Sequence, residues 1–579
     1  MNGPANALDW NSIDWAKAEN DVRRLRQRIF KATQDGDIKK VRNLQKLMLR
    51  SFSNTLVSVR RVTQQSAGRK TAGIDKERAL TANSRARLAT ETNRLSQPWR
   101  ARPVKRVYIP KSNGKQRPLG IPVIRDRALQ ARVKNAMEPE WEARFEPRSY
   151  GFRPGRGCHD AIEAIYCVAR GRSKRQWVLD ADLAGAFDHI SHDHLLKAIG
   201  RFPARELIYR WLKAGVMEDG RFLATDEGTP QGGVISPLLM NIALHGLETA
   251  AGCQYKVLKS GREPEAVPGT PVLVRYADDF VALCHSEEEA RRVRRKLDEW
   301  LRPRGLAFNE KKTRVVHLDE GFDFLGFNVR RYSGKLLIKP SKEAVKRFRA
   351  RLRTEMISLR GANVGAVLRR VVPITRGWAA YYRIGVSSKA FGSLDNYVWK
   401  LTYKWAKYRH PNKSRYWVCD RYFGRFNGER RDRWVFGDHA TGAHLQKLAW
   451  TKIVRHVKVR GSASMDDPAL ATYWNDRRKR QARALPLDKK ALSLAYLQRG
   501  LCPLCRKALI AGAEFEREDP RFWAEWFWIQ LRGGGLNRHH LTYRKNGGTD
   551  EKKNLILVHA DCHQMHHAMI DRRPTTQVL

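Results

Sequence analysis

The feature that most narrows the possible folds is an apolar stretch, residues 272–283, interrupted by two adjacent aspartates. The residues on either side of Asp278 and Asp279 are mostly β-branched or aromatic, so the stretch predicts a β-hairpin with both carboxylates at its turn. Adjacent like charges are unfavourable unless a cation lies between them, and carboxylate oxygens suit a divalent metal ion. The pair therefore indicates either a metal-binding hairpin or a plain exposed acidic turn.

The second constraint is charge. The chain carries a net charge of +52 over 579 residues, and its basic stretches at 23–70, 342–353 and 474–490 all contain apolar residues, unlike a disordered basic tail. A surplus spread in this way predicts a polyanionic partner that covers much of the surface. The length predicts about three or four domains.

Two further patterns bear on location. No apolar run approaches the length that spans a membrane, and residues 1–15 lack the basic and apolar regions of a signal peptide. The few cysteines include a group near the C-terminus, which favours metal binding over disulfides. We therefore expect a reducing, cytoplasmic compartment and no membrane partner.

Apolar spacing predicts two helices near the N-terminus, with a break at Asp35-Gly36. Their expected buried faces consist of Val22, Leu25, Ile29 and Phe30 in the first helix, and of Val41, Leu44, Leu47 and Met48 in the second. Residues 105–122 then predict a basic hairpin that turns at Ser112-Asn113-Gly114.

Three more elements are predicted further along. Residues 238–247 form an apolar segment typical of a helix. Ser286 predicts an N-cap, with Glu289 completing a capping box and Pro303 ending the helix. Beyond Pro340 the sequence is helical and basic up to about Pro411.

A two-metal site for nucleotidyl transfer needs a further carboxylate shared by both ions, and cations for the triphosphate. Asp182 is the candidate carboxylate, because it follows a strand predicted at 177–181 and precedes a predicted helix. Phe187, five residues later, would stand beside the sugar of an incoming nucleotide, where an aromatic ring can reject a 2′-hydroxyl. The alternative is an ordinary core phenylalanine.

Six short motifs occur in one order along the chain. They are Thr71–Asp75 (TAGID), Arg117–Pro122 (RPLGIP), Tyr150–Arg156 (YGFRPGR), Gly228–Leu238 (GTPQGGVISPL), Tyr276–Asp279 (YADD) and Phe324–Phe327 (FLGF). One short motif is weak support, but six in order are specific. Over roughly residues 20–330 the chain resembles the reverse transcriptase–maturases encoded by group II introns. One departure is Lys76, where a glycine commonly stands.

The resemblance implies a set of polymerase residues. Asp182, Asp278 and Asp279 would be the catalytic carboxylates that hold two Mg²⁺ ions, with Leu183 assigned to the same metal site. The expected nucleotide-binding residues are Lys115 and Arg117 on the triphosphate, Phe187 at the sugar, and Gln231 and Gly232 along the nucleotide and template. Lys312 would protonate the leaving pyrophosphate, or would be a plain solvated lysine.

Residues 377–383 and 405–411 resemble the thumb, or X domain, of the same family. The resemblance implies that aromatics pack a helical bundle here while Arg and Lys meet RNA phosphates. From the residues alone this region is only a basic helical domain. The resemblance adds a maturase role, in which the protein stabilises its folded intron RNA. Val372 departs from the Asn that often precedes the proline of this block.

Near the C-terminus, Cys502 and Cys505 pair with His559 and Cys562, and each pair has two intervening residues. Four nitrogen and sulfur ligands at this spacing predict a structural Zn²⁺ site. The alternative leaves His559 as a free surface residue. The mixed set departs from the four cysteines common in the module that this region resembles, the HNH, or ββα-metal, endonucleases.

By that resemblance His540 is the general base, His539 and His563 hold one divalent ion such as Mg²⁺, and Asn554 orients His540. A neutral imidazole near pH 7 can accept a proton. Because the two histidines are adjacent, a swap of their roles stays open. His566 and His567 are unassigned, and Phe522–Trp528 is expected to form the core of the module.

These expectations give a multidomain α+β chain: a right-hand polymerase, a helical thumb/X domain, a basic DNA-binding segment and a ββα-metal (HNH) zinc-knuckle nuclease module. The predicted ranges are 1–100 (basic helical extension of the fingers), 101–335 (fingers and palm), 336–415 (thumb/X maturase domain), 416–494 (DNA-binding region) and 495–579 (endonuclease). The expected partners are the group II intron RNA, target DNA and dNTP. The expected location is bacterial cytoplasm, at the nucleoid, with an organelle host left open.

Two alternatives compete with this interpretation. One is another prokaryotic reverse transcriptase, of the retron or diversity-generating kind, against which the thumb motifs and the nuclease module argue. The other is a non-catalytic RNA-binding splicing factor, against which the intact Asp182, Asp278, Asp279, His540 and Asn554 argue.

Overall fold

The computed structural model describes residues 8–93, 99–110, 114, 116–171, 174–256, 265–428, 430–440, 442–484, 489–506, 509, 536–543, 546–559, 562, 563 and 566, with side chains left out at 478–484 and 489. Lys115, Ser112-Asn113, Phe522–Trp528 and His567 lie outside the described residues. The chain forms two compact units. The first comprises Met1–Leu325, Val329–Leu337 and His456–Asn475, and the second comprises Gly326–Asn328, Ile338–Arg455 and Asp476–Leu579.

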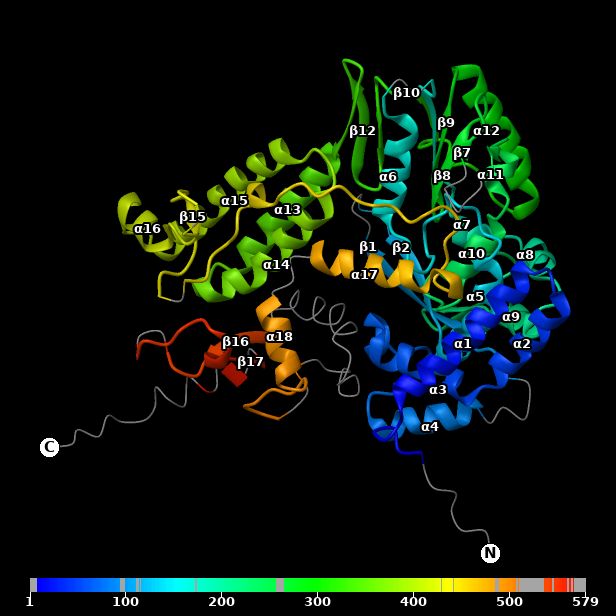
Figure 1. Cartoon of the computed structure of the whole chain (residues 1–579), viewed down its shortest axis with the longest axis horizontal. Helices are drawn as coiled ribbons and strands as arrows, with labels where there is room; N and C mark the ends of the chain where they lie inside the picture. The colour runs from blue at the N-terminus through cyan, green and yellow to red at the C-terminus, as the bar shows by residue number, and fades with distance from the viewer. Residues whose placement is uncertain are drawn as a thin grey trace, which may run out of the picture. The chain divides into compact units, whose positions relative to one another are not determined.

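The helices up to residue 301 all belong to the first unit (Figure 1). They are α1 (Trp15–Gln34), α2 (Ile38–Arg50), α3 (Phe52–Arg60), α4 (Ala82–Asn93), α5 (Ile124–Glu142), α6 (Cys158–Ala169), α7 (Ala186–His189), α8 (His192–Ile199), α9 (Arg205–Leu212), α10 (Ser236–Ala243), α11 (Leu247–Ala250) and α12 (Glu287–Leu301). A π-helical turn, Arg61–Gln65, follows α3, and a 3₁₀ turn, Ala67–Lys70, follows that turn.

The strands that precede residue 341 form several sheets. They are β1 (Val104–Pro110), β2 (Gln116–Ile121), β3 (Trp177–Ala181), β4 (Val216–Glu218), β5 (Arg221–Leu223), β6 (Tyr255–Lys256), β7 (Glu265–Ala266), β8 (Val272–Tyr276), β9 (Asp279–Cys284), β10 (Arg314–His317), β11 (Phe322–Phe324), β12 (Phe327–Tyr332) and β13 (Lys335–Pro340). Their sheet orders are β2-β1-β4-β5, β10-β3-β9-β8, β11-β12-β13 and β6-β7.

The palm sheet, β10-β3-β9-β8, is antiparallel throughout. Val272–Val274 and Phe280–Cys284 are buried on both faces of the sheet, because α12 packs on β3 and β9 while α6 packs on β8. Figure 1 shows β8 and β9 between these two helices. The strand prediction for 177–181 is confirmed, and so is the hairpin, whose turn lies between the paired residues Tyr276 and Asp279.

The two N-terminal helices, α1 and α2, form as predicted and pack against α5. The prediction that Leu47 is buried is wrong, since its side chain is 49% exposed. The helical period instead turns Gln45 inward beside Val41, Leu44 and Met48. Burial of Gln45 is tolerated because its amide donates to the carboxylate of Glu140 on α5, at 2.7 Å.

Two other predictions need correction. The expected helix over 238–247 ends at Ala243, because Gly246 adopts a left-handed conformation (φ 95°) before the short helix α11. Ser286 caps α12 as predicted, accepting a hydrogen bond from the Glu289 N–H at 3.1 Å. The capping box is wrong by one residue, since the Glu289 carboxylate accepts from the His285 N–H at 2.6 Å.

A stretch of the predicted DNA-binding region, His456–Asn475, packs within the first unit. Asp466 accepts two hydrogen bonds of 2.7 Å from Arg26 on α1, and His456 lies 2.9 Å from the buried carboxylate of Asp160 on α6. Its sequence position gives no hint of this docking.

The second unit begins with a helical bundle of α13 (Lys342–Ser358), α14 (Val364–Tyr382) and α15 (Ser388–Arg409), as the basic helical pattern predicts. Trp378 stacks on Phe348, with ring centroids 4.7 Å apart. The remaining elements are α16 (Arg415–Tyr422), β14 (Phe423–Gly424), β15 (Val435–Phe436), α18 (Lys489–Leu497), β16 (Leu536–His540) and β17 (Leu555–His559), while α17 (Ala471–Ala484) starts in the first unit. None of the helices in the described part of the chain is long and apolar enough to cross a membrane.

Candidate active sites

The three predicted catalytic aspartates meet at one edge of the palm sheet. β3 pairs with β9 so that Ala181 lies opposite Phe280, which brings Asp182, just past β3, beside Asp279 at the start of β9. Asp278 occupies the turn between β8 and β9. The strand register therefore brings Asp182 close to Asp278 and Asp279, which are about a hundred residues away in sequence.

The electrostatics of this cluster call for a cation. Burial, the charge of Asp278 and a hydrogen bond with Asp182 together raise the pKa of Asp279 to about 8. Burial also raises the pKa of Asp278, and the charge of Asp182 adds to that rise. Crowded carboxylates are hard oxygen donors, so the residues fit a site for divalent ions, which would remove the repulsion.

Asp182 is held by the segment between α12 and β10. The Asn309 amide and the Lys312 ammonium both donate to its Oδ2 atom, at 3.1 Å and 2.7 Å. The backbone is fixed as well, because the Asn309 N–H donates to the Asp182 carbonyl at 2.8 Å. Lys312 is therefore a direct neighbour of the cluster, although 62% of its side chain is exposed.

The hairpin turn rests on a buried scaffold. Arg275, which is 1% exposed, donates to Asn241 at 3.0 Å and to the Ala277 carbonyl at 3.3 Å. Behind the turn lies Gly151, and a Cβ atom there would come within 2.2 Å of the Ala277 nitrogen. The YGFRPGR motif thus supports the turn through close backbone approach.

Of the predicted nucleotide-binding residues, Arg117 lies on β2, and Gln231 and Gly232 lie on the loop before α10. Arg117 is exposed on β2. Its positive charge is close enough to Asp278 to oppose part of the rise in the pKa of that carboxyl. The Gly120 N–H donates to the Gln231 carbonyl at 2.8 Å, and a Cβ on Gly232 (φ 125°) would meet the Gly120 carbonyl at 2.7 Å. The loop is therefore pinned to β2. Lys115 lies outside the described residues.

Phe187 and Leu183 flank the aspartates on the segment after β3. Leu183 is buried and forms a β-bridge with Phe308. Phe187 on α7 is half-buried, and its ring makes an edge contact with Phe152, with centroids 6.1 Å apart. Phe152 is 44% exposed, so this aromatic pair differs from a fully buried core contact.

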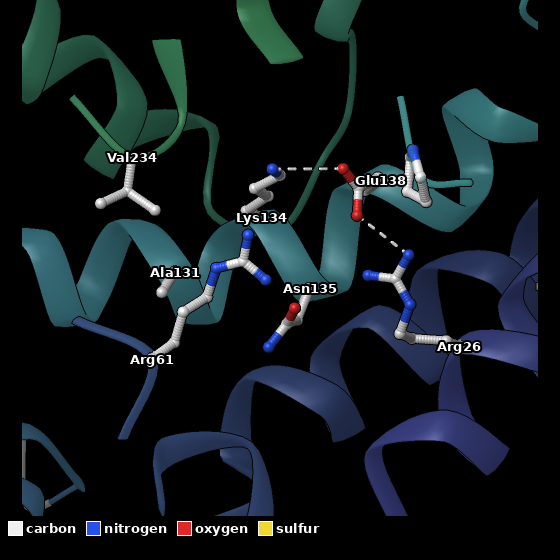
Figure 2. A pocket seen from close by; sticks show the side chains of 8 residues that line it. Arg26, Arg61, Ala131, Lys134, Asn135, Glu138 and Val234 are labelled. Atoms are coloured by element: carbon white, nitrogen blue, oxygen red, sulfur yellow. Dashed lines mark hydrogen bonds and ion pairs between the residues drawn. The ribbon is translucent and has the colours of Figure 1, made fainter. Parts of the chain in front are cut away.

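A basic cavity of about 220 Å³ lies among α1, the π-helical turn and α5. Val234 from the loop before α10 and Pro154 from the loop before α6 also line it. Figure 2 shows Glu138 between two of its cations, Lys134 at 3.4 Å and Arg26 at 2.9 Å. Val234 also receives support from α5, since its N–H donates to Gln130 at 2.8 Å. Helix α5 therefore contacts both the cavity and the loop that holds Gln231 and Gly232.

In the second unit the predicted zinc ligands come together. One ligand atom from each of Cys502, Cys505, His559 and Cys562 lies within 4.8 Å of all the others. Tetrahedral bonds of about 2.3 Å place sulfur ligands roughly 3.8 Å apart, so the group fits a zinc ion. Burial and the adjacent sulfurs raise the pKa of the Cys562 thiol to about 12, whereas a bound cation would favour the thiolate.

The predicted nuclease residues lie on and beside the hairpin β16–β17. His539 is buried, and its ring centroid is 5.2 Å from that of His563 and 4.9 Å from that of His566. His540 has a different neighbour, since its Nε2 lies 2.7 Å from a carboxylate oxygen of Asp550. The two adjacent histidines thus have distinct surroundings, with His539 grouped with His563.

Asn554 contacts the loop that follows His540. Its side chain accepts from the Thr542 N–H at 2.7 Å and donates to the carbonyls of Thr542 and Thr549 at 2.9 Å and 2.8 Å. These bonds use both amide hydrogens and tie Asn554 to the backbone of the loop that follows His540.

Several site residues were not predicted from the sequence. Asn309 and Asp550 carry no motif signal, and only the folded register brings them to Asp182 and His540. Asp180, which lies on β3 two residues before Asp182, pairs with Arg314 at 3.1 Å, and burial raises its pKa to about 6. The sequence did contain one indication of Asp180, because it is the single charged residue in the otherwise apolar strand 177–181.

Comparisons with known proteins agree with this geometry. Residues 109–329 match the reverse transcriptase (RNA-dependent DNA polymerase) family, and residues 10–92 match the N-terminal domain of reverse transcriptase. Residues 345–423 match the group II intron maturase-specific domain, and residues 530–569 match the HNH endonucleases. The last two matches favour an intron-encoded protein over the retron and diversity-generating alternatives.

Three known proteins are similar to this chain in sequence. Protein YkfC of Escherichia coli is 37% identical over 306 residues, which cover 47% of this chain and 79% of that protein. The group II intron-encoded protein LtrA of Lactococcus lactis is 32% identical over 302 residues, which cover 42% of this chain and 49% of LtrA. Maturase-like protein 1 of Euglena gracilis is 25% identical over 381 residues, covering 64% and 76%. The chain therefore belongs to the group II intron-encoded reverse transcriptases, with a maturase-specific domain and an HNH endonuclease domain.

Proposed function

We propose that this protein carries out target-primed reverse transcription: its nuclease domain nicks one strand of target DNA, and its polymerase site extends the new 3′ end along the intron RNA. The observation that carries the proposal is the convergence of Asp182, Asp278 and Asp279 at one sheet edge. A second site, on the hairpin of the second unit, would supply the primer.

In the polymerase site the three aspartates would hold two Mg²⁺ ions, which stabilise charge on the attacking and leaving oxygens when bound. Leu183, at the same strand end, is proposed as a further ligand through its backbone carbonyl oxygen. Arg117, and Lys115 with it, would neutralise the triphosphate. Lys312 would deliver a proton to the leaving pyrophosphate, and Phe187 would exclude a 2′-hydroxyl.

In the nuclease site His540 would take a proton from the attacking water. His539 and His563 would hold a divalent ion such as Mg²⁺, which stabilises charge at the scissile phosphate when bound. The Zn²⁺ proposed for Cys502, Cys505, His559 and Cys562 has a structural role, because all four ligand positions come from the protein.

Binding of intron RNA is proposed for the helical bundle. Two tyrosines on α15 and α16 are unusually exposed, Tyr408 at 59% and Tyr416 at 84%. Cations accompany these aromatics, since Arg360 lies over the Tyr408 ring at 5.0 Å and Lys413 over the Trp417 ring at 5.5 Å. Exposed rings with adjacent cations suit stacking on unpaired bases. DNA contact is proposed for residues 416–494.

The test measures both activities on the full chain. Primer extension on an RNA template with Mg²⁺ should yield cDNA, and His540→Ala should reduce nicking of DNA to a small residual rate while extension continues. Cys505→Ala should release zinc and lose nicking, again with extension intact. Absence of cDNA from the wild-type protein would contradict the polymerase proposal, and loss of both activities in His540→Ala would contradict the division into two sites.

A further inference from the structure

The loop between β16 and β17 presents a carboxylate to the predicted general base. The Oδ1 atom of Asp550 lies 2.7 Å from Nε2 of His540. The His540 side chain is 22% exposed and that of Asp550 is 50% exposed. A solvent-exposed pair of this kind contributes little to the stability of the fold. Stability therefore does not explain why the Asp550 carboxylate lies beside the His540 imidazole.

The backbone that carries Asp550 is braced on both sides. Asn554 holds the preceding residue through the Thr549 carbonyl at 2.8 Å, and the Lys490 ammonium donates to the Asp550 carbonyl at 3.2 Å. Gly548 packs so closely that a Cβ atom there would come within 1.9 Å of the Thr542 carbonyl oxygen. The carboxylate is thus delivered by a fixed loop, which is what positioning a catalytic ring requires.

A carboxylate that is hydrogen-bonded to one nitrogen of an imidazole ring determines whether the other nitrogen can accept a proton. Because an ionised carboxylate only accepts hydrogen bonds, it keeps the proton on Nε2 and leaves Nδ1 as the acceptor. It also stabilises the imidazolium that forms when Nδ1 takes a second proton. Asp550 is placed to do both through its contact with Nε2 of His540.

We propose that Asp550 is a positioning residue for His540: it fixes the ring and its tautomer so that Nδ1 faces the attacking water. In the step that follows, a water O–H bond breaks and its proton passes to Nδ1. The water oxygen bonds to phosphorus, and the bond from phosphorus to the 3′ oxygen breaks. The 3′ oxygen leaves with the electron pair of that bond and takes a proton from a solvent water molecule, which gives the 3′ hydroxyl. This inference rests on the nuclease function proposed for His540, and it moves the role of Asn554 from the ring to the loop.

The chain offers a matched control in the next residue. Glu551 is also an acidic loop residue, but its carboxylate pairs with Lys553 at 3.0 Å, with both side chains exposed by 60% or more. Substitution of Glu551 changes the local charge by the same amount without touching His540.

The experiment measures single-turnover nicking of supercoiled plasmid DNA by the full chain with Mg²⁺. Asp550→Ala should slow the nicking step about 10- to 100-fold while DNA affinity stays within about twofold, and Glu551→Ala should leave both unchanged. Bound zinc and primer extension report that the fold is intact. If Asp550→Ala loses its zinc, Asp550→Asn, which keeps the shape, takes its place and should still be slow.

A double variant separates positioning from an independent role. If Asp550 acts through His540, His540→Ala/Asp550→Ala should nick no more slowly than His540→Ala alone. A wild-type rate in Asp550→Ala, or an equal loss in the His540→Ala background, would overturn the proposal. If His540→Ala itself nicks at the wild-type rate, the nuclease function assigned to His540 fails, and the role of Asp550 fails with it.

Discussion

The ammonium nitrogen of Lys312 lies 2.7 Å from the Oδ2 atom of Asp182. The sequence alone leaves Lys312 as either a proton donor or a solvated lysine. The contact ties it to the carboxylate cluster, where a cation would be drawn toward the charge that develops on the leaving pyrophosphate.

Replacement of Lys312 tests this role. Lys312→Ala should slow single-turnover nucleotide addition by about 100-fold, which is typical of the loss of a general acid. The adjacent Lys311 is exposed and serves as the control, since Lys311→Ala should change the rate by less than about twofold. Equal rates for the two variants would return Lys312 to the class of solvated lysines.

Gly151 should tolerate no side chain, because a Cβ atom would lie 2.2 Å from the Ala277 nitrogen in the turn that carries Asp278. Gly151→Ala should therefore displace the turn and reduce nucleotide addition severely. A Cβ atom on Gly157, in the same loop, would have its nearest neighbour 3.9 Å away, so Gly157→Ala should extend primers at the wild-type rate. A fully active Gly151→Ala would show that the turn is not rigidly supported.

Phe187 should determine which sugar is accepted. Phe187→Ala should raise kcat/KM for ribonucleotides relative to deoxyribonucleotides by about tenfold or more, because one removed steric contact is worth roughly 1–3 kcal/mol. The comparison is made by single-nucleotide addition on one primer–template pair. If both kinds of nucleotide lose efficiency equally, Phe187 is a packing residue.

Local pattern predicted much of the fold. The hairpin at 272–283, the strand at 177–181 and the cap at Ser286 all depend on neighbouring residues, so their signals lie within a few positions of sequence. The zinc group was predictable for the same reason, since the knuckle spacing itself brings the ligands of each pair together.

Contacts that depend on tertiary packing escaped prediction. Gln45 takes a buried place only because Glu140 on another helix satisfies it, and Arg26 meets Asp466 across 440 residues. Asp550 reaches His540 only when the loop is folded. Hydrophobic periodicity carries no information on such polar partnerships.

Glu248 should give the first unit a pH-dependent stability. Burial, and then the charge of Glu146, raise its pKa to about 7 from an ordinary 4.5. The folded state therefore holds the proton more tightly, so this contribution is fully present below about pH 4.5 and is lost as the pH rises to about 7. The loss amounts to a few kcal/mol.

Glu248→Gln keeps the acceptor for the Arg148 N–H. It should abolish the part of the fall in unfolding free energy with rising pH that Glu248 causes. The measurement is the difference in unfolding free energy between wild type and variant from pH 4 to 8, in metal-free buffer. Glu206→Gln on α9, where 65% of the side chain is exposed, should give a flat difference. A flat difference for Glu248→Gln as well would contradict the raised pKa.

The central claim is that Asp182, Asp278 and Asp279 form one polymerase site, and RNA-templated primer extension by Asp278→Asn tests it most directly. The expected result is that the variant makes no detectable cDNA with Mg²⁺ and still nicks DNA, while Glu299→Gln, an exposed change on α12, extends normally. Extension by Asp278→Asn at the wild-type rate would contradict the claim.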